Sequence, residues 1–524
     1  MKKVIQIAFV FLLAVVTFAF LKPKQTSKPN ILMIVMDDAG LDMSAYGRTW
    51  VNTPGFDRIA REGILFNKAY TPNAKCGPSR SSIITGRNSW QLDAAANHWM
   101  HFPTKFKTYP ETLQENGYRV GYTGKAWGPG VAFNADGSKR ELMGERIDIH
   151  TMESPTQFIS KNDYTANFKE FVGKTSSAQP WCFWVGFTEP HRAYEYQSGE
   201  KLGGKKKSDI ENVPSYWPDV DSVRSDMLDY AYEIEYVDDH VQKILDHLEK
   251  IGELDNTLII YTSDHGMPFP RVKGNQYENA NHVPMAVRWG NGIKGKSLNV
   301  NDYVSFVDIA PTLLEAAGIS MVESKMQPIV GKSLLPIFKS GRSGQVDQER
   351  DFLLVGQERH DVGRPGDVGY PIRGMHKNGF LFLKNYETSR WPVCDPITGY
   401  LNCDGSPTKS FILNQRRNGE PKHYWSLNFG KRESIELYDL TNDKDCVINL
   451  ANEPKYASVV REMENEMEAK LLSQDDLRMS GFGHIYEQYP VANQKNFYER
   501  FMAGEKMITG WVNDSDFEQE TLED

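Results

Sequence analysis

The chain lacks any excess of positive charge. Its 60 Lys and Arg residues stand against 69 Asp and Glu residues, which leaves a formal net charge of −9. A nucleic-acid-binding protein needs a basic face, so this balance argues against nucleic acid as a partner. It remains compatible with an anionic substrate, because a binding site responds to the local field and not to the net charge.

Internal repeats and low-complexity tracts are absent as well, and the composition is that of an ordinary globular protein. Hydrophobic residues make up 40% and charged residues 25% of the sequence, which is close to the average for soluble domains. The length of 524 residues allows about three domains, although large α/β domains make two an equal alternative.

One long apolar stretch stands at the N-terminus. Met1-Lys2-Lys3 precede an apolar run over residues 4–21, a pattern typical of a signal peptide, with Ala19 as the better cleavage candidate. Because the run is long, an uncleaved N-terminal anchor is the alternative. No cysteine follows the run, which disfavours a lipoprotein anchor. The sequence therefore predicts an exported protein, periplasmic or secreted, with membrane attachment only through an uncleaved N-terminal segment.

Three continuous apolar runs predict strands that are buried on both faces of a parallel sheet. They cover residues 30–36, 181–187 and 257–262. Before the third run, apolar residues from Met227 to Ile251 recur at spacings of three and four, which predicts a long amphipathic helix. Alternating strands and helices indicate an α/β fold, with a large mixed, mostly parallel sheet sandwiched by helices. Ligands in such folds gather at the carboxyl ends of the strands.

The sequence changes character near residue 375. Residues 379–384 and 436–440 have the pattern of short strands between loops rich in Asn, Gly and Pro, and helical patterning returns over 456–472. We therefore expect a smaller C-terminal α+β domain over residues 376–512, with an antiparallel sheet and a packed helix. Residues 513–524 form an acidic tail, which we expect to fray.

The most informative segment is Cys76-Gly77-Pro78-Ser79-Arg80, which continues as Ser-Ser-Ile-Ile-Thr-Gly-Arg. Proline favours the first turn of a helix, so we expect a helix over residues 79–85 that ends at Gly86. Cys76 would lie at the helix N-terminus, where free N–H groups and the helix dipole favour an anion. A lone cysteine is more often an inert buried residue. This one would instead be a nucleophile beside a bound oxyanion.

The segment resembles the signature of the type I sulfatases of the alkaline phosphatase superfamily, Cys-x-Pro-Ser-Arg-x-x-x-Leu/Ile-Thr-Gly. The cysteine of that signature is oxidised to formylglycine. The resemblance implies a catalytic domain over residues 28–375 that hydrolyses sulfate esters, and a formylglycine-generating or sulfatase-maturating enzyme as a partner. One hydroxyl of the hydrated aldehyde would attack sulfur, and the second would then collapse to the aldehyde and expel sulfate. A Ser or Cys nucleophile lacks that second hydroxyl.

Two predicted strand ends carry groups that suit a metal ion. Asp37-Asp38 close the first strand and Asp264-His265 follow a later one. By the resemblance, Asp37, Asp38, Asp264 and His265 are metal ligands, with modified Cys76 completing the set. Three carboxylates form a hard-oxygen site that favours Ca²⁺ over Mg²⁺ or Mn²⁺. His265 stands where Asn is commoner in the family, and imidazole suits Zn or Mn better.

The resemblance also assigns residues to the sulfate and to catalysis. Arg80 offers a planar fork that can grip two oxygens. Lys125, in Tyr-Thr-Gly-Lys, and Lys273, in Arg-Val-Lys-Gly, match the two lysine segments of the family. His191, in Thr-Glu-Pro-His-Arg, would contact the sulfate and protonate the leaving oxygen. With Cys76, these residues form the predicted catalytic set.

One position departs from the family pattern. Most members place a histidine two residues after the first lysine, where it helps to activate or break down the formylglycine hydrate, but this chain has Trp127 there. Either another group, such as His191, supplies the base, or the chain belongs to a subgroup that works without that histidine. The segments 263–270 and 190–192 most resemble the heparan N-sulfatase-like branch.

An exported member of this family would act on a sulfated carbohydrate. Aromatic and cationic residues near the predicted site are candidates for binding an anionic sugar, with ordinary loop packing as an equal alternative: His98, Trp99, Trp127, Arg192, Tyr194, Tyr277 and His282. Three alternatives to a sulfate-ester hydrolase stay open. They are an N-sulfoglucosamine-type sulfamidase, a phosphatase or phosphonate-ester hydrolase of the same superfamily, and a non-catalytic glycan-binding relative.

Cysteine is scarce, with five residues in the chain. An exported protein can hold disulfides, and modification of Cys76 would leave an even four. Cys394 and Cys403 flank a short polar turn and are candidates for a disulfide.

Overall fold

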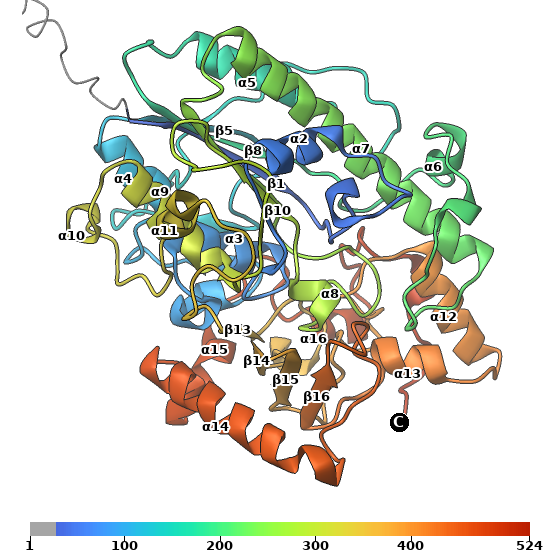
Figure 1. Cartoon of the computed structure of the whole chain (residues 1–524). Helices are drawn as coiled ribbons and strands as arrows, with labels where there is room; N and C mark the ends of the chain where they lie inside the picture. The colour runs from blue at the N-terminus through green and yellow to red at the C-terminus, as the bar shows by residue number, and fades with distance from the viewer. Residues whose placement is uncertain (1–27, 524) are drawn as a thin grey trace, which may run out of the picture.

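The computed structural model describes residues 28–523, so the predicted signal peptide or anchor over residues 1–21 lies outside the described residues. An eight-stranded sheet runs through the larger part of the fold (Figure 1), in the order β11–β2–β10–β9–β1–β8–β5–β7. Its strands are β1 (Asn30–Met36), β2 (Ile64–Phe66), β5 (Arg119–Gly124), β7 (Glu145–Arg146), β8 (Trp181–Gly186), β9 (Thr257–Ser263), β10 (Met285–Arg288) and β11 (Leu298–Val300). Only β10 runs antiparallel to its neighbours in this sheet, which confirms the predicted mixed, mostly parallel sheet.

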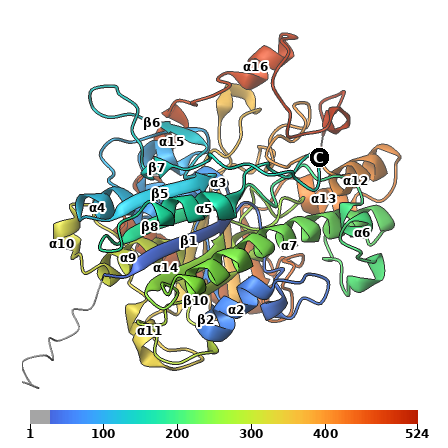
Figure 2. The ribbon, with the colours of Figure 1, turned by 90° about the horizontal axis from the view of Figure 1, so that it is seen from above.

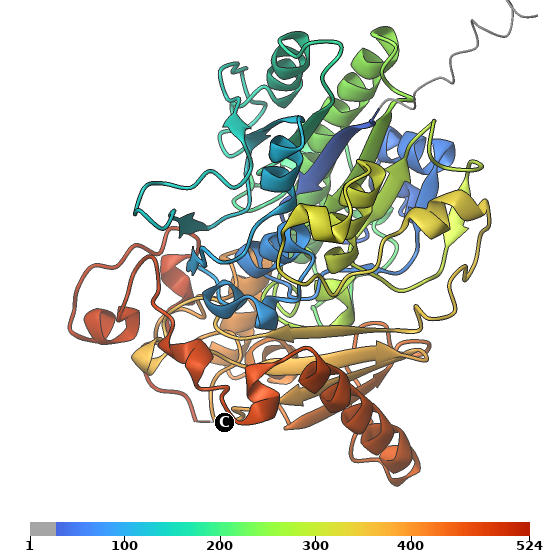
Figure 3. The same ribbon diagram turned by 90° about the vertical axis from the view of Figure 1, so that its left-hand side faces the viewer.

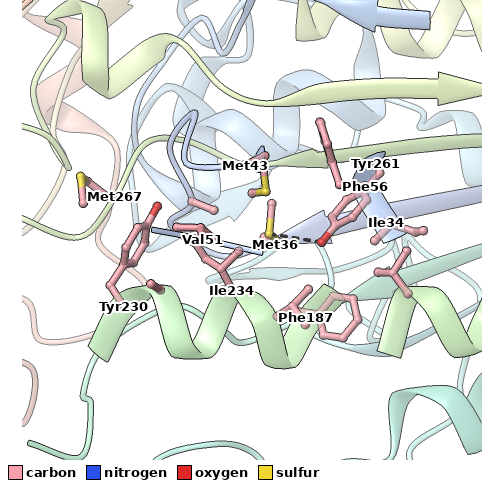
Figure 4. Packing of buried hydrophobic residues seen from close by; sticks show 14 of the residues in the cluster. Ile34, Met36, Met43, Val51, Phe56, Phe187, Tyr230, Ile234, Tyr261 and Met267 are labelled. Atoms are coloured by element: carbon pink, nitrogen blue, oxygen red, sulfur yellow. Dashed lines mark hydrogen bonds between the residues drawn. The ribbon is translucent and has the colours of Figure 1, made fainter. Parts of the chain in front are cut away.

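The central strand β1 is buried on both faces and supplies both hydrophobic cores. Leu32, Ile34 and Met36 pack on one face against three helices, α2 (Pro54–Glu62), α5 (Tyr164–Gly173) and α7 (Asp221–Lys250). Helix α7 runs alongside β1 (Figure 2) and buries its apolar stripe there, as the spacing of its residues predicts. Figure 4 shows this core, in which the Tyr261 hydroxyl lies 3.7 Å from the sulfur of Met36.

Helices also cover the opposite face of the sheet. They are α3 (Cys76–Thr85), α4 (Tyr109–Glu115), α9 (Ile309–Ala316) and α11 (Leu335–Ser340). Their apolar residues pack against Ile31, Met33 and Val35 of β1. The alternation of β1 side chains between the two cores is the reason that its sequence is apolar without interruption.

A second, antiparallel sheet lies beside the first in the order β13–β14–β15–β16. Its strands are β13 (Phe352–Gln357), β14 (Ile372–Lys377), β15 (Phe380–Asn385) and β16 (Ile435–Asp439). Helix α14 (Ala457–Ser473) covers the outer face of this sheet (Figure 3), and its Met463, Met467 and Leu471 are buried there. The other face packs against Tyr70, Tyr277 and Tyr303 of the larger domain. The predicted antiparallel sheet and packed helix are confirmed, although β13 lies before residue 376.

The C-terminal region also contributes helices and loops that return to the larger domain. Helices α12 (Pro407–Arg417) and α13 (His423–Phe429) lie beside the N-terminal end of α7. Ile412, Leu413 and Phe429 belong to the same core as β1 and α7. The two sheets are therefore joined by packed side chains and not by a flexible linker.

The acidic tail is docked, which corrects the expectation that it frays. Asp516 is fully buried, and its Oδ2 lies 3.1 Å from the Nζ of Lys409, which is also fully buried. Glu518 pairs with Arg416 at 2.8 Å and with Arg417 at 3.1 Å. A buried lysine needs a nearby opposite charge, and the tail supplies it.

The predicted disulfide is not formed, because all five cysteines are free. The sulfur of Cys394 faces the carbonyl oxygen of Asp361 at 3.6 Å, and that of Cys403 faces the carbonyl oxygen of Asp404 at 3.8 Å. The two thiols thus point at different backbone groups. Among residues 28–523, no helix has the length and apolar character needed to cross a bilayer.

Removing the tail carboxylate should destabilise the fold. In Asp516→Asn the ammonium of Lys409 keeps the carbonyl oxygens of Gly399 and Cys403 but loses its buried counter-charge. We expect a loss of about 3 kcal/mol in the free energy of unfolding, measured by urea denaturation. The exposed neighbour Asp514 provides the control. Asp514→Asn should change the free energy of unfolding by less than about 0.5 kcal/mol. Equal stabilities of the two variants would contradict the docked tail.

Candidate active site

Four neighbouring strands end at one edge of the large sheet and carry the predicted site residues there. In β9, β1, β8 and β5 the last residues are aligned: Met36 pairs with Ser263, Val35 with Gly186, and Gly186 with Gly124. The residues that follow are Asp264-His265, Asp37-Asp38, the segment to His191, and Lys125. The parallel register explains why residues far apart in sequence meet at this edge.

The ends of β1 and β9 are tied to each other by hydrogen bonds. The amide of Asp264 donates to the carbonyl oxygen of Met36 at 3.1 Å, and the amide of Asp38 donates to Asp264 Oδ1 at 3.0 Å. Asp38 has a φ of 72°, a left-handed conformation that Asp tolerates better than most residues. This turn directs the Asp38 carboxylate back toward Asp264.

Helix α3 brings Cys76 to the same place. The helix begins at Cys76 and is closed by Gly86, whose φ of 69° suits a glycine C-cap, as predicted. The hydroxyl of Ser79 donates to the carbonyl oxygen of Asp264 at 2.5 Å, which attaches the first turn to the end of β9. The Cys76 sulfur lies 3.4 Å from His265 Nε2 and 3.9 Å from Asp38 Oδ1.

Asp38, Cys76, Asp264 and His265 form a set of donors that fits a divalent cation. One donor atom of each lies within 4.8 Å of those of the other three, and all four residues are buried. The Nδ1–H of His265 donates to the carbonyl oxygen of Gly266 at 3.0 Å, so in the neutral imidazole Nε2 carries a lone pair. His265 Nε2 lies 3.0 Å from Asp38 Oδ1. Two acceptors held face to face in a buried site suit a bound cation between them.

Asp37 stands apart from that set and binds two cationic side chains. Its carboxylate oxygens lie 2.6 and 2.5 Å from Lys125 Nζ, and Oδ1 lies 3.2 Å from Arg80 Nη2. Burial opposes the charged form of Asp37, but Lys125 and Arg80 outweigh it and hold its pKa below the usual range.

The guanidinium of Arg80 is fully buried and engaged on every side. Nε lies 2.8 Å from Asp264 Oδ2, Nη2 donates to Asp37, and Nη1 donates to the carbonyl oxygen of Ala126 at 2.9 Å. The structure therefore places Arg80 as the link between the carboxylates of Asp37 and Asp264 and the loop after β5. Its predicted grip on two sulfate oxygens has no free donor pair in this arrangement.

Lys273 lies at the centre of a second network, which reaches His191. Its Nζ is 2.7 Å from Asp38 Oδ2, 2.7 Å from Asp404 Oδ2 and 3.0 Å from His191 Nε2. The His191 Nδ1–H donates to the carbonyl oxygen of Arg192 at 2.7 Å, so Nε2 faces Lys273 and the site. Burial disfavours the charge on Asp38, but Lys273, His191 and His265 together outweigh it and lower the pKa of Asp38 to about 2.

Burial has the opposite effect on the thiol. It raises the pKa of Cys76 well above the usual value, and the carboxylates of Asp37, Asp264 and Asp38 add to this, while Lys125 opposes it. Reactive cysteines sit in electropositive surroundings that favour the thiolate. The unmodified side chain does not have those surroundings.

The residues predicted to bind substrate are more widely scattered. The buried Arg192 pairs with both carboxylate oxygens of Asp226, at 2.7 and 2.9 Å, and lies over the ring of Tyr194. Both nitrogens of His282 are engaged, one with Glu278 at 2.8 Å and one with the carbonyl oxygen of Asn67 at 2.9 Å. These contacts hold loops together, in line with the alternative of ordinary packing.

The aromatic candidates for substrate binding also contact other side chains of the protein. Trp127 packs edge-on against Phe102, with ring centroids 5.4 Å apart, and the Tyr277 hydroxyl donates to Glu436 at 3.0 Å. Trp99 and His98 both contact Asp361, through Trp99 Nε1 at 3.0 Å and His98 Nδ1 at 3.2 Å.

Three charged residues of the site carried no recognisable signal in the sequence. Asp404 lies in a loop of the C-terminal region, and Asp361 lies between β13 and β14. Both reach the larger domain, where Asp404 binds Lys273 and Asp361 binds Lys75 at 2.5 Å. Lys75 precedes the Cys76 segment directly, so its position was the one available hint. The two carboxylates come from segments after β13, and no spacing rule links them to Lys75 and Lys273.

Comparisons with known proteins agree with this geometry. Residues 29–319 match the Sulfatase family. The human N-sulphoglucosamine sulphohydrolase is 26% identical over 479 residues, which cover 84% of this chain and 89% of that protein. An ulvan-active sulfatase of Formosa agariphila is 26% identical over 484 residues, 86% of this chain and 76% of that protein.

Solved structures share the fold. A protein in complex with its substrate, D-glucosamine-2-N,6-O-disulfate, superposes with a TM-score of 0.61 at 20% identity, over 86% of this chain and 99% of that one. The phosphonate monoester hydrolase of Agrobacterium radiobacter gives a TM-score of 0.56 at 17% identity, over 85% of this chain and 95% of that one. Because the family match over residues 29–319 covers more than half of the chain, the protein belongs to the sulfatase family and is a sulfuric ester hydrolase.

Proposed function

We propose that this sulfatase removes sulfate groups from a sulfated carbohydrate, through a formylglycine made from Cys76 and a divalent cation, with Ca²⁺ as the first choice. One observation carries the proposal. Cys76 starts helix α3 within a buried group of carboxylates and cations, and none of the other described cysteines starts a helix or belongs to a set of donors that could hold a metal ion. Modification of that cysteine gives the site the nucleophile that the buried thiol does not provide.

Asp38, Asp264, His265 and residue 76 are the residues that would hold the cation, and Asp37, the fifth predicted ligand, would join them by exchanging its contacts with Lys125 and Arg80 for the cation. Two carboxylates and the side-chain oxygen of a modified residue 76 make the set mainly oxygen, which suits Ca²⁺, while the imidazole of His265 would extend the tolerance to Mn²⁺. When bound, the cation would act as a Lewis acid that draws negative charge from a sulfate oxygen.

Lys125 and Lys273 supply the positive charge that a transferring sulfate group needs. Lys125 is held by Asp37 and Lys273 by Asp38 and Asp404, so both ammonium groups are fixed before a substrate arrives. Such preorganised charges stabilise the charge that develops in the transition state without any reorganisation. Arg80 then serves as a positioning residue, because it holds Asp37 and Asp264.

His191 is the candidate for protonating the leaving oxygen. Its ring is fixed by the carbonyl oxygen of Arg192, and Nε2 receives a hydrogen bond from Lys273. The His191 side chain is 29% exposed, whereas those of Asp38 and Asp264 are fully buried, so it lies on the side from which a substrate enters. Nε2 would take up the proton that Lys273 donates to it and pass that proton to a departing oxygen.

The relatives support the substrate class. The human relative is named for N-sulphoglucosamine, and the relative from Formosa agariphila for ulvan. The structural relative was solved with a glucosamine that carries both an N-sulfate and an O-sulfate. We therefore propose a sulfated oligosaccharide or polysaccharide as substrate, with an N-sulfoglucosamine sulfamidase as the second candidate.

A phosphonate-ester hydrolase shares the fold, but the sequence relatives at 26% identity are named as sulphohydrolase and sulfatase, which favours sulfate. The proposal further includes export, supported by the apolar run over residues 4–21, and a maturation enzyme that acts on Cys76. An exported enzyme would meet an extracellular polysaccharide directly.

Replacing the nucleophile should abolish turnover. Cys76→Ala removes the side chain that becomes the nucleophile, so we expect release of sulfate from an aryl sulfate or sugar sulfate to fall by at least about 10⁴-fold. Cys182→Ala is the matched control, because Cys182 is equally buried but lies inside β8. It should retain most of the turnover. Turnover by Cys76→Ala at the wild-type rate would contradict the proposal.

Metal binding should be visible as stability. Adding Ca²⁺ at about 100 times its Kd to chelator-treated protein should stabilise it by about 2.7 kcal/mol, measured as an upward shift in Tm. In His265→Asn an amide oxygen replaces the imidazole, so the shift with Ca²⁺ should persist while that with Mn²⁺ declines. No shift with any divalent cation in the wild-type protein would rule out the site.

Matched substrates should separate the two ester classes. We expect kcat/KM for an aryl sulfate to exceed that for the corresponding aryl phosphate by at least about 10²-fold, because Arg80, Lys125 and Lys273 are all already paired with carboxylates and a dianion carries more charge. Comparing N-sulfoglucosamine with glucosamine 6-sulfate in the same assay would choose between the two carbohydrate candidates. A preference for the phosphate would favour the phosphatase alternative.

A further inference from the structure

The place where the family pattern has a histidine is filled by a residue that cannot act as a base. Trp127 packs on Phe102, and a side chain at Gly130 would meet its ring at 3.0 Å. An indole N–H only donates hydrogen bonds. If residue 76 is hydrated, one of its hydroxyl protons has to be accepted by some other group.

His98 approaches the nucleophile turn from a different loop. It lies between the short helix at Asp93–Ala96 and strand β4 (Met100–Phe102). A Cβ at Gly77 would lie 3.4 Å from His98 Cδ2 and 3.2 Å from the carbonyl oxygen of Pro129. His98 and the loop that carries Trp127 therefore meet at the same glycine, the residue next to Cys76. Gly77 allows this close approach because it has no side chain.

The orientation of the His98 ring is fixed by contacts on its Nδ1 side. Nδ1 lies 3.2 Å from Asp361 Oδ1, and a carboxylate only accepts, so Nδ1 carries the hydrogen. Asp361 is in turn held by Lys75 Nζ at 2.5 Å and by Trp99 Nε1 at 3.0 Å. The His98 amide donates to the carbonyl oxygen of Arg359 at 2.9 Å. The ring is thus held in the tautomer whose Nε2 carries a lone pair.

That lone pair has no partner among residues 28–523. His98 is only 6% exposed, and its Nε2 is buried without a hydrogen bond, a costly state that native proteins rarely keep without a reason. The other three histidines around the Cys76 turn differ, because both ring nitrogens of His191, His265 and His360 have polar neighbours. Burial lowers the pKa of His98 to about 4, with Asp361 opposing it, so the ring is neutral at neutral pH.

We propose that His98 is the base that accepts a proton from the hydrated side chain at position 76, and that Asp361 and Lys75 are its positioning residues. The inference rests on the proposed function, because it needs the hydrated aldehyde. It gives the chain an Asp–His pair in place of the histidine that it lacks at position 127.

The step in which sulfate leaves can be written in full. After transfer, the carbon of residue 76 carries one hydroxyl and one sulfate ester. His98 Nε2 takes the hydroxyl proton, the C=O bond forms, and the C–O bond to sulfate breaks with its electron pair leaving on sulfate. Water then adds to the aldehyde and restores the two hydroxyls, and the imidazolium returns its proton to water. No oxidant or reductant is needed.

The direct test is His98→Ala, expressed with the maturation enzyme and compared with the wild type. Because this base acts after the first sulfur–oxygen bond is broken, we expect kcat to fall by about 10²–10⁴-fold, with KM lowered or unchanged. Rapid quenching followed by mass spectrometry should find the residue-76 peptide carrying a sulfate in the variant, and mostly the free aldehyde in the wild type. His101→Ala, three residues along the same segment, is the control and should behave as the wild type.

Rescue distinguishes a base from a structural residue. Trp127→His in the His98→Ala background restores a histidine to the other side of Gly77, so we expect it to recover at least about tenfold in kcat, and added imidazole to recover part of the loss. Asp361→Asn should lower kcat less than His98→Ala. His98→Gln, which fills the same space, guards against a folding defect and should accumulate the sulfated peptide as well.

Two results would overturn the inference. One is wild-type turnover by His98→Ala with normal aldehyde content. The other is lost turnover in both His98 variants without a sulfated peptide, whether or not the aldehyde is present. Failure of the proposed function itself would look different, since the wild-type protein would then release no sulfate and carry no aldehyde at position 76.

Discussion

The whole site depends on burying several carboxylates side by side. Asp37, Asp38 and Asp264 are all buried at the carboxyl ends of two adjacent strands, where like charges repel and water cannot screen them. Arg80 and Lys125 neutralise part of this charge from the α3 and β5 side, and Lys273 neutralises another part from the opposite side. The remaining donors are the ones that would hold a divalent cation. The same charges that make the site costly to fold make it suited to an anionic substrate.

This balance explains why the active site needs both domains. Asp404 and Asp361 come from the C-terminal region and neutralise Lys273 and Lys75, which lie in the larger domain. The loop that holds Asp404 is itself fixed by Lys409, whose counter-charge is Asp516 in the tail. Two ion pairs and one hydrogen bond thus connect the last helical turn of the described chain to Lys273. The C-terminal region acts as a structural part of the site and not as an appendage.

The sequence predicted the larger features well because they follow from local patterns. The apolar run of β1 and the spacing of the apolar residues in α7 each depend on neighbouring residues alone. The same is true of the proline near the start of α3 and the glycine at its end. The positions of Asp37, Asp38 and Asp264 followed from motifs at strand ends, and that of Cys76 from a motif at a helix start. The partners of Arg80 and Arg192 did not, because an arginine pattern looks the same whether the guanidinium binds a substrate or a buried carboxylate. The docked tail and the Asp361–His98 contact join residues more than a hundred positions apart, which no local pattern records.

The central claim is that residue 76 acts as a formylglycine in this setting. It is tested most directly by the mass of the tryptic peptide that spans residue 76, in protein purified from its native host, before and after treatment with an aldehyde-reactive hydrazide. The account predicts a peptide lighter than the cysteine form that gains the mass of the hydrazide. A peptide with the mass of unmodified cysteine, which reacts with a thiol reagent and not with the hydrazide, would contradict it.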